Sequence, residues 1–327
     1  MGTLLTTSRM DPALAARIEA SVSGRRAKAD GPRWSPRAVA VWRVTLVLAI
    51  ATLGYLAVRA RRQDRHEVER SRAALLEAVR ARSASLAPTD LGSVARAEAW
   101  LTRFAGRYEG DLIADELRAP DGLRAALARQ AIYVRGPLAS FSSHAQLEEA
   151  AAASAKDALL LCLVDPPTSR AEKGLLATIH VAYAGGAALE ERTAHVRRLN
   201  DAIVGLPVLA PAWAARVKSA DDSAELGRLR RELDRAPIER AKQAARASLL
   251  VFAIDEPGEG GGPTELDGER AHAVRVGVVD LTSAKILLRM RKKVDPSWIS
   301  VDRRPRYASG LDSCALALDV HEGVRPR

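Results

Sequence analysis

The hydrophobic positions of the chain first single out one segment, Ala38–Val58, which reads AVAVWRVTLVLAIATLGYLAV. Its only charged residue is Arg43, close enough to the N-terminal end for the side chain to extend to lipid head groups. About 20 apolar residues, at a rise of roughly 1.5 Å each, span the hydrocarbon layer of a bilayer. We therefore predict a single transmembrane helix at residues 38–58 and a lipid bilayer as the first partner.

Aromatic and basic residues typical of membrane interfaces bracket this segment. These membrane-interface residues are Trp34, Arg37, Trp42, Arg43, Tyr55, Arg59, Arg61 and Arg62. Basic residues are almost equally frequent on both sides, so the positive-inside rule does not fix the orientation. Because long domains are translocated largely regardless of charge, we favour a tail inside and a large domain outside. In a bacterium this places the anchor in the inner membrane and the C-terminal domain in the periplasm.

The pattern around the predicted helix divides the rest of the N-terminal part. We expect a flexible tail at residues 1–37, a charged juxtamembrane helix at 59–85 and a helical connector at 86–130. The juxtamembrane helix has a narrow apolar stripe of Val68, Leu75, Leu76 and Val79. Such a stripe permits a weak homodimer through residues 64–83, although a solvated stalk is the simpler interpretation.

Residues 131–327 have the pattern of an α/β (or α+β) domain. Strands are predicted at 131–135, 159–164, 178–184 and 249–254, and helices at 144–155, 189–204, 222–236, 237–247 and 307–320. Residues 154–165 align with 244–255 without a gap, and Pro167 aligns with Pro257. We interpret this as two possible α-β-β modules that share a sheet, with coincidence in an Ala- and Leu-rich chain as the alternative.

Two alternating segments near the C-terminus predict an antiparallel hairpin. We expect the pairs Val278–Ile286, Val276–Leu288 and Val274–Met290, with a loop of three residues or, with a frayed last rung, five. A slip of one residue would place Val276 opposite Arg289 and is therefore disfavoured. The opposite face then carries four basic side chains, a possible anion-binding face of Arg275, Arg289, Arg291 and Lys293.

The turn of this hairpin has a short resemblance. Val279–Leu287 (VDLTSAKIL) resembles a strand-turn-strand phrase of bacterial envelope lipoproteins of the curli-secretion and penicillin-binding-protein-activator types. The phrase also resembles propeller repeats, and the lipidated cysteine of those lipoproteins is missing here. It assigns no family to the chain.

Charge changes the picture only at the N-terminal end. The chain carries 50 Lys+Arg against 40 Asp+Glu, a net charge of +10. Residues 1–85 account for +9 of this and residues 86–327 for +1. Enrichment in Ala and Arg is also typical of a GC-rich coding sequence. We therefore expect lipid head groups, and no nucleic acid, to contact the excess charge.

Searches for catalytic motifs support no specific chemistry. The glycine-rich stretch 257–263 lacks a following Gly-Lys-Ser/Thr, no G-x-S-x-G occurs, and the six histidines lack metal-helix spacing. We expect no cofactor and no metal. Cys162 and Cys314 are expected to be buried thiols, with a disulfide as the alternative in an oxidising compartment.

These observations lead to three functional hypotheses. The first is a single-pass, non-catalytic binding or scaffolding protein of the bacterial cell envelope, with another envelope protein as partner. The second is a cytoplasm-facing regulatory module that binds an anionic ligand through the basic hairpin face. The third is an enzyme whose site is assembled from residues distant in sequence. We favour a protein without enzymatic activity but leave the question open.

Overall fold

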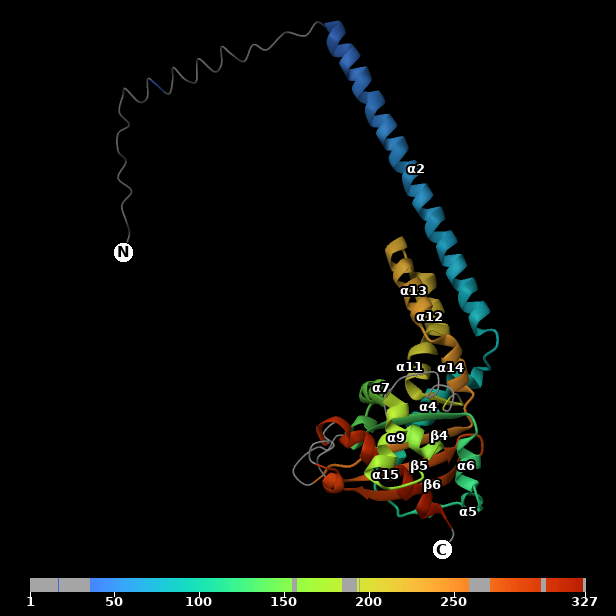
Figure 1. Ribbon diagram of the computed structural model, residues 1–327. Helices are drawn as coiled ribbons and strands as arrows, with labels where there is room; N and C mark the ends of the chain where they lie inside the picture. Colours follow the sequence, from blue (N-terminus) through green and yellow to red (C-terminus); the bar gives the residue numbers. More distant parts are fainter. Residues whose placement is uncertain are drawn as a thin grey trace, which may run out of the picture. The chain divides into compact units, whose positions relative to one another are not determined.

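The structure is a computed structural model that describes Arg17 and residues 36–154, 158–183, 193, 195–258, 271–300 and 304–325. The chain forms two compact units, residues 1–67 and 68–327 (Figure 1). The second unit includes residues 68–130 together with the segment 131–327.

The first unit is dominated by helix α2 (Pro36–Ser83), which continues into the second unit. Its apolar segment is exposed from Ala40 onward, and the helix is long and apolar enough to cross a membrane. The hydroxyls of Thr45 and Thr52 donate to the carbonyls four residues earlier, so neither polar group needs water. The helix predicted at residues 38–58 is confirmed as a helix. Of the predicted interface residues, Trp34 lies outside the described residues and the others are exposed on α2.

The second unit contains a six-stranded mixed sheet in the order β1-β6-β5-β4-β2-β3. The strands are β1 (Leu112–Ile113), β2 (Ala131–Pro137), β3 (Val196–Arg198), β4 (Leu249–Asp255), β5 (His272–Asp280) and β6 (Lys285–Val294). Strand β2 pairs parallel with β3 and β4, and the other neighbours are antiparallel. The predicted strands at 131–135 and 249–254 are therefore confirmed, while the expected helical connector also supplies the edge strand β1.

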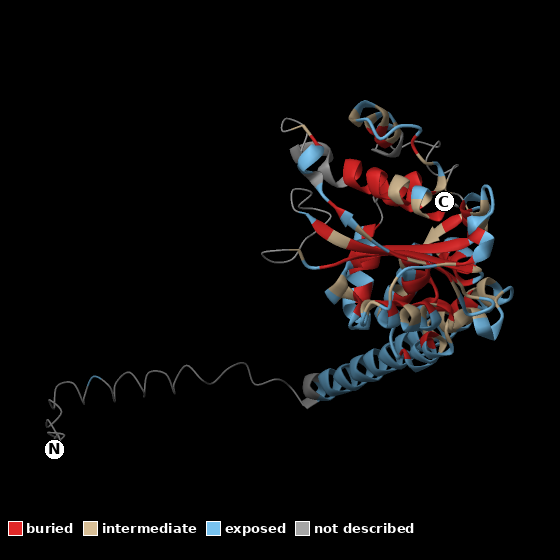
Figure 2. Ribbon diagram, turned by 90° about the horizontal axis from the view of Figure 1, so that it is seen from below, coloured by how far each residue is buried: buried red, intermediate tan, exposed pale blue. Residues whose placement is uncertain are grey.

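Helices cover both faces of the sheet. They are α3 (Pro88–Leu91), α4 (Ser93–Ala105), α5 (Asp115–Arg118), α6 (Gly122–Leu127), α7 (His144–Ala153), α8 (Ala158–Val164), α9 (Glu172–Tyr183), α11 (Leu199–Gly205), α12 (Pro211–Ser219), α13 (Ser223–Arg235), α14 (Ile238–Ala245) and α15 (Arg304–Val324), with short 3-10 turns η1 (Leu138–Phe141), η3 (Pro207–Leu209) and η4 (Pro296–Trp298). One apolar cluster joins the sheet to α5, α6, α8, α9 and α15, and a second joins its other face to α4, α7, α11 and α14. The buried residues therefore form a three-layer core with the sheet in the middle (Figure 2).

A third apolar cluster lies away from the sheet. The C-terminal part of α2 packs there against α12 and α13, with Leu75 and Val79 buried beside Trp213 and Leu229. The stripe that could have joined two copies is therefore used within the chain, because it covers the apolar face of this helical hairpin. A homodimer through residues 64–83 stays a prediction, although the apolar stripe that suggested it packs against α12 and α13.

Two strand predictions are wrong. Residues 159–164 belong to helix α8, and 178–183 belong to helix α9. A short apolar run has no periodicity that separates a strand from a buried helix, and the Ala and Leu of α8 are strong helix formers. In α9 the buried pair Leu175 and Ile179, four residues apart, forms a helical stripe that overrides the local alternation. The two α-β-β modules are therefore not present, because residues 158–164 form helix α8 where the aligned segment 244–255 supplies strand β4.

The helix predictions fared better. Helices α7, α13, α14 and α15 confirm the segments predicted at 144–155, 222–236, 237–247 and 307–320, with shifted ends. The segment predicted as a helix at 189–204 is described only in part: β3 is followed directly by α11, and residues 189–192 and 194 lie outside the described residues.

In the hairpin of β5 and β6 the predicted residues share a face, but the pairs between the two strands differ from the prediction. Val278 pairs with Leu288 and Val276 with Met290, each shifted by two residues from the prediction. A bulge between Val278 and Val279 and a four-residue turn cause the shift. The Asp280 carboxylate accepts hydrogen bonds from the backbone of the turn, and Ala284 has a positive φ of 54°. Both features depend on turn geometry rather than on the hydrophobic pattern.

Gly277 gives a test of the register between β5 and its other neighbour, β4. It lies opposite Phe252, and a Cβ at residue 277 would come within 2.1 Å of the Phe252 ring. That ring is fully buried and packs edge-on against Phe104 at 4.6 Å. We expect Gly277→Ala to lower the free energy of unfolding by about 1–3 kcal/mol in chemical denaturation, since overpacked cores are destabilised.

Gly227 is the matched control. It lies in α13, where an added Cβ would meet only the flexible Arg231 side chain. Gly227→Ala should stabilise the chain by up to about 1 kcal/mol because alanine is the better helix former. Stabilisation by both substitutions would contradict the register.

Candidate functional site

Polar side chains gather at the carboxyl ends of the neighbouring parallel strands β2 and β4. Arg135 lies near the end of β2 and Asp255 at the end of β4, and His272 begins the adjacent β5. Asp312 and Ser313 of α15 approach the same place, as their interactions below show. All five are at most 6% exposed. Ligand sites of open α/β sheets form outside this edge, so the cluster is the candidate site.

Arg135 is the centre of the cluster. Its Nε and Nη2 donate to the two carboxylate oxygens of Asp255 at 3.0 and 2.8 Å, and its Nη1 donates to Ser313 Oγ at 2.7 Å. The Arg135 backbone N–H donates to Ser154 Oγ, whose hydroxyl donates back to the Arg135 carbonyl. One residue therefore links two strand ends, the end of α7 and helix α15.

Asp255 is held in its charged form. Burial alone would raise its pKa, but the Arg135 charge and hydrogen bonds from His272 and Arg135 lower it to about 2. His272 Nε2 lies 3.2 Å from Asp255 Oδ1. The Arg135–Asp255 pair is therefore a closed, charge-matched unit.

Asp312 differs from Asp255 in its hydrogen bonding. It is only 5% exposed, and its Oδ1 has no hydrogen-bond partner among the described residues. Burial raises the pKa of Asp312 to about 7, although the charges of His272 and Arg135 act in the opposite direction. Asp295 adds a smaller increase. The protonation of Asp312 thus changes near neutral pH.

A cavity of about 520 Å³ adjoins Asp312, and we call it the α15 cavity. Its charged and aromatic lining residues are Arg170, Lys293, Asp295, Trp298, Asp312 and Asp319. Arg170 and Asp319 form an ion pair across it. The Trp298 side chain, at 43% exposure, offers an indole surface to solvent. The cavity therefore combines an acidic group, both signs of charge and an aromatic wall.

The four basic residues of the expected anion-binding face do lie on one face of the hairpin, because the strand pairs place them there. Arg275 and Arg291 both pair with Glu256, and Arg275 also donates to the carbonyl of Phe104 at 2.8 Å. Burial favours the protonated form of Glu256, but hydrogen bonds from Arg291 and Arg275 outweigh it and lower its pKa.

The other two residues of that face differ from each other. Arg289 pairs with Glu109 and donates to the Gly110 carbonyl at 2.8 Å, whereas Lys293 is exposed and lines the α15 cavity. Anion binding by this face stays a prediction, and an anion there would compete with Glu256 and Glu109 for three of its four cations.

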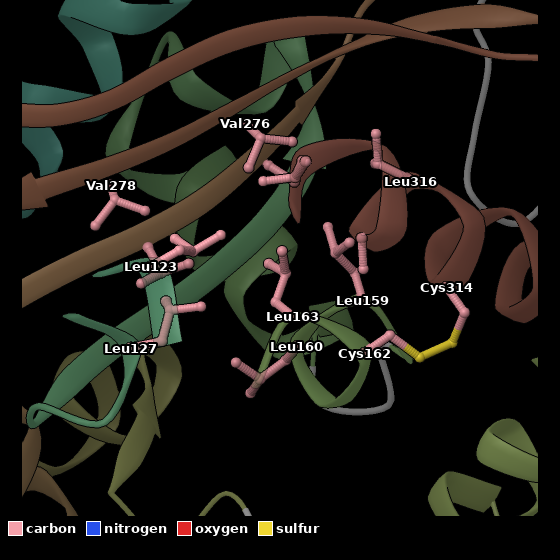
Figure 3. Packing of buried hydrophobic residues seen from close by; sticks show 14 of the residues in the cluster. Leu123, Leu127, Leu159, Leu160, Cys162, Leu163, Val276, Val278, Cys314 and Leu316 are labelled. Carbon is pink, nitrogen blue, oxygen red and sulfur yellow. A yellow bond between two sulfur atoms is a disulfide. The ribbon is translucent and has the colours of Figure 1, made fainter. Parts of the chain in front are cut away.

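The two cysteines form a disulfide, so the expectation of buried free thiols is wrong. Cys162 of α8 and Cys314 of α15 are fully buried, with their Cα atoms 5.1 Å apart (Figure 3). The bond lies in the apolar core beside Leu159 and Leu316. It fastens α15 to its neighbour close to Asp312.

Sequence reasoning missed the central members of the site. Arg135 and Asp255 each follow an apolar run, so charges at the ends of two strands were a usable signal. Nothing in the sequence of α15 marks Asp312 as buried, since exposure of helical residues depends on the packing. Within the described ranges, no group of three or more His, Cys, Asp or Glu residues could hold a metal ion.

Comparison with known proteins adds no assignment: no family model, curated protein or solved structure matches this chain.

The buried ion pair gives the first prediction for this site. Asp255→Ala removes the carboxylate that matches the Arg135 guanidinium, and it should lower the free energy of unfolding by about 3–5 kcal/mol. Glu77→Ala, which removes the exposed Glu77–Arg80 pair, should change it by less than about 1 kcal/mol. Chemical denaturation at neutral pH measures both, and equal effects would show that the buried pair has no special weight.

Asp312 gives a second prediction, in its pH dependence. Because the folded-state pKa is raised from 3.8 to about 7, the folded chain binds more protons than the unfolded chain between these values. Its free energy of unfolding should therefore fall as the pH rises through this window. Asp312→Asn should remove this dependence and stabilise the chain at pH 8 by up to about 4 kcal/mol, with little effect near pH 4.

Denaturation curves at the two pH values measure the difference. Glu322→Gln, an exposed change on the same helix, is the control and should leave the pH dependence unaltered. If the free energy of unfolding of the wild-type chain changed between the two pH values no more than that of Asp312→Asn, a buried, titrating Asp312 would be contradicted.

Proposed function

We propose that the chain is a single-pass membrane protein of the bacterial cell envelope. Its unit 68–327 lies on the oxidising side of the inner membrane and binds or scaffolds another envelope protein without catalysis. Helix α2 supports the anchor, since its apolar segment is exposed and long enough to span a bilayer.

The observation that carries the placement is the Cys162–Cys314 disulfide. Structural disulfides persist in the periplasm and other oxidising compartments and are rare in the reducing cytosol. The bond joins two core helices, so its formation accompanies folding of the unit. This supports a tail on the cytoplasmic side and the large unit on the other side, where the charges flanking α2 left the orientation open.

A binding role is supported by the way the unit uses its charges. The buried clusters around Arg135 and Glu256 are matched internally, as are the cations of the hairpin face other than Lys293. Such ion pairs position elements of the fold and provide no reacting group. A cytoplasm-facing module that binds anions through the hairpin face is less well supported, because its arginines already hold carboxylates.

An enzyme is the second candidate, on one observation. Asp312 borders a cavity and has a pKa near 7, a combination that is common among catalytic acids and bases. The substitution Asp312→Asn distinguishes the two candidate functions. A scaffold should keep its affinity for its partner, whereas an enzyme that uses this carboxyl group should lose turnover.

The placement predicts the redox state of the cysteines. In full-length chain produced in a bacterium, a thiol-reactive polyethylene glycol maleimide should modify no cysteine of the denatured protein until reductant is added, and both cysteines afterwards. A C-terminal fusion should be active with a reporter that folds only outside the cytoplasm. The paired substitution of Cys162 and Cys314 by serine should lower the free energy of unfolding by about 2–5 kcal/mol.

A chain that lacks residues 38–58 is the control, because it stays in the cytosol and its cysteines should react without reductant. Free cysteines in the full-length protein, together with activity only from a cytoplasm-specific reporter, would overturn the placement.

A further inference from the structure

The α15 cavity is bordered by Asp312, a carboxyl group with one buried oxygen that the described chain leaves without a hydrogen-bond donor. Asp312 lines the cavity and is 95% removed from solvent, and its Oδ1 receives no hydrogen bond from a described residue. Buried carboxylate oxygens are normally satisfied, because a desolvated acceptor without a donor costs free energy. The missing element of the site is therefore a donor.

The neighbouring charges limit what that donor can be. Arg135 and His272 face Asp312 from the sheet, but both already interact with Asp255. Across the cavity, Arg170 is paired with Asp319, while Lys293 and Asp295 lie at the end of β6. Three carboxyl groups and two basic groups line the cavity, so a cation fits it better than an anion.

The wall of the cavity suits the body of such a ligand. Trp298 is 43% exposed, and Ala315 and Leu316 add an apolar surface from α15. An indole face attracts a nearby cation and also packs against carbon atoms. A volume of about 520 Å³ lies within the range of small-molecule sites.

We propose that the α15 cavity binds a small organic ammonium compound, whose ammonium group donates to Asp312 while its carbon body packs against Trp298. An ammonium group supplies both the donor and the positive charge that a buried carboxylate lacks, whereas an alcohol supplies only the donor. The proposal does not rest on the function proposed above, since the cavity belongs to the 68–327 unit wherever that unit lies.

Binding of this kind is coupled to proton release. Without ligand, burial raises the pKa of Asp312 to about 7, so the carboxyl group is largely protonated in mildly acidic solution. The ammonium compound binds the carboxylate form and must displace that proton. Its affinity should therefore rise about tenfold per pH unit below this pKa and level off above it.

The test uses the full-length chain in detergent micelles, labelled with fluorotryptophan. The chain has five tryptophans, and the spectrum of Trp298→Phe identifies the Trp298 resonance. Benzylamine is the probe, benzyl alcohol its neutral isostere and benzoate its anionic counterpart. We expect benzylamine at pH 8 to shift the Trp298 resonance saturably, with affinity about tenfold weaker at pH 6 and at least tenfold weaker in Asp312→Asn.

The controls separate binding from folding. Glu322→Gln lies on the same helix outside the cavity and should bind benzylamine as the wild-type chain does. Unchanged resonances of Trp100 and Trp213, which lie in the same unit, show that Asp312→Asn is folded. The pH dependence of the wild-type chain tests the proposal independently of that variant.

Three results would overturn the proposal. One is no shift of the Trp298 resonance up to the solubility limit of benzylamine. Another is equal or tighter binding of benzyl alcohol or benzoate. The last is benzylamine affinity that depends on neither pH nor Asp312. None of them bears on the membrane placement, which the cysteine and reporter experiments decide separately.

Discussion

The guanidinium of Arg135 holds together parts of the chain that are far apart in sequence. It binds Asp255, 120 residues away at the end of β4, and Ser313, 178 residues away on α15, while its backbone binds Ser154 at the end of α7. A buried guanidinium is costly to desolvate, so it is tolerated only when these partners are in place together. The position of α15 on the sheet follows from this condition, and with it the positions of Asp312 and Cys314. The Arg135–Ser313 hydrogen bond, the disulfide and the α15 cavity thus all depend on the position of one helix.

The elements that the sequence predicted well are those whose periodicity extends over their whole length. Strand β5 and helix α13 are of this kind, because each presents an apolar stripe to one layer. Strand β4 (LLVFAI) was predicted correctly from an apolar run that has no period. Helix α8 was mistaken for a strand because seven apolar residues contain no period at all. The parity of the β5–β6 hairpin could be predicted because a slip of one residue buries Arg289. Its exact pairs could not, since a bulge and a four-residue turn leave the apolar pattern nearly unchanged.

The candidate site was less accessible to prediction, for a related physical reason. The hairpin arginines were placed correctly on one face, but their effect depends on Glu256 and Glu109, which reach them through tertiary structure. A basic stripe in a sequence therefore says little about a free positive surface until its acidic partners are known. Asp312 is the converse case: its burial, not its neighbours in sequence, gives it an unusual pKa. Sequence shows which groups titrate, whereas packing decides at which pH they do so.

The disulfide and the buried carboxyl group act on the same helix in opposite directions. Above neutral pH a desolvated Asp312 favours displacement of α15, because exposure to water would relieve the cost of its charge. Cys314 lies two residues further along α15 and ties the helix covalently to α8, so that this displacement is restricted. The disulfide is therefore the covalent constraint under which a buried carboxyl group can stay beside the α15 cavity.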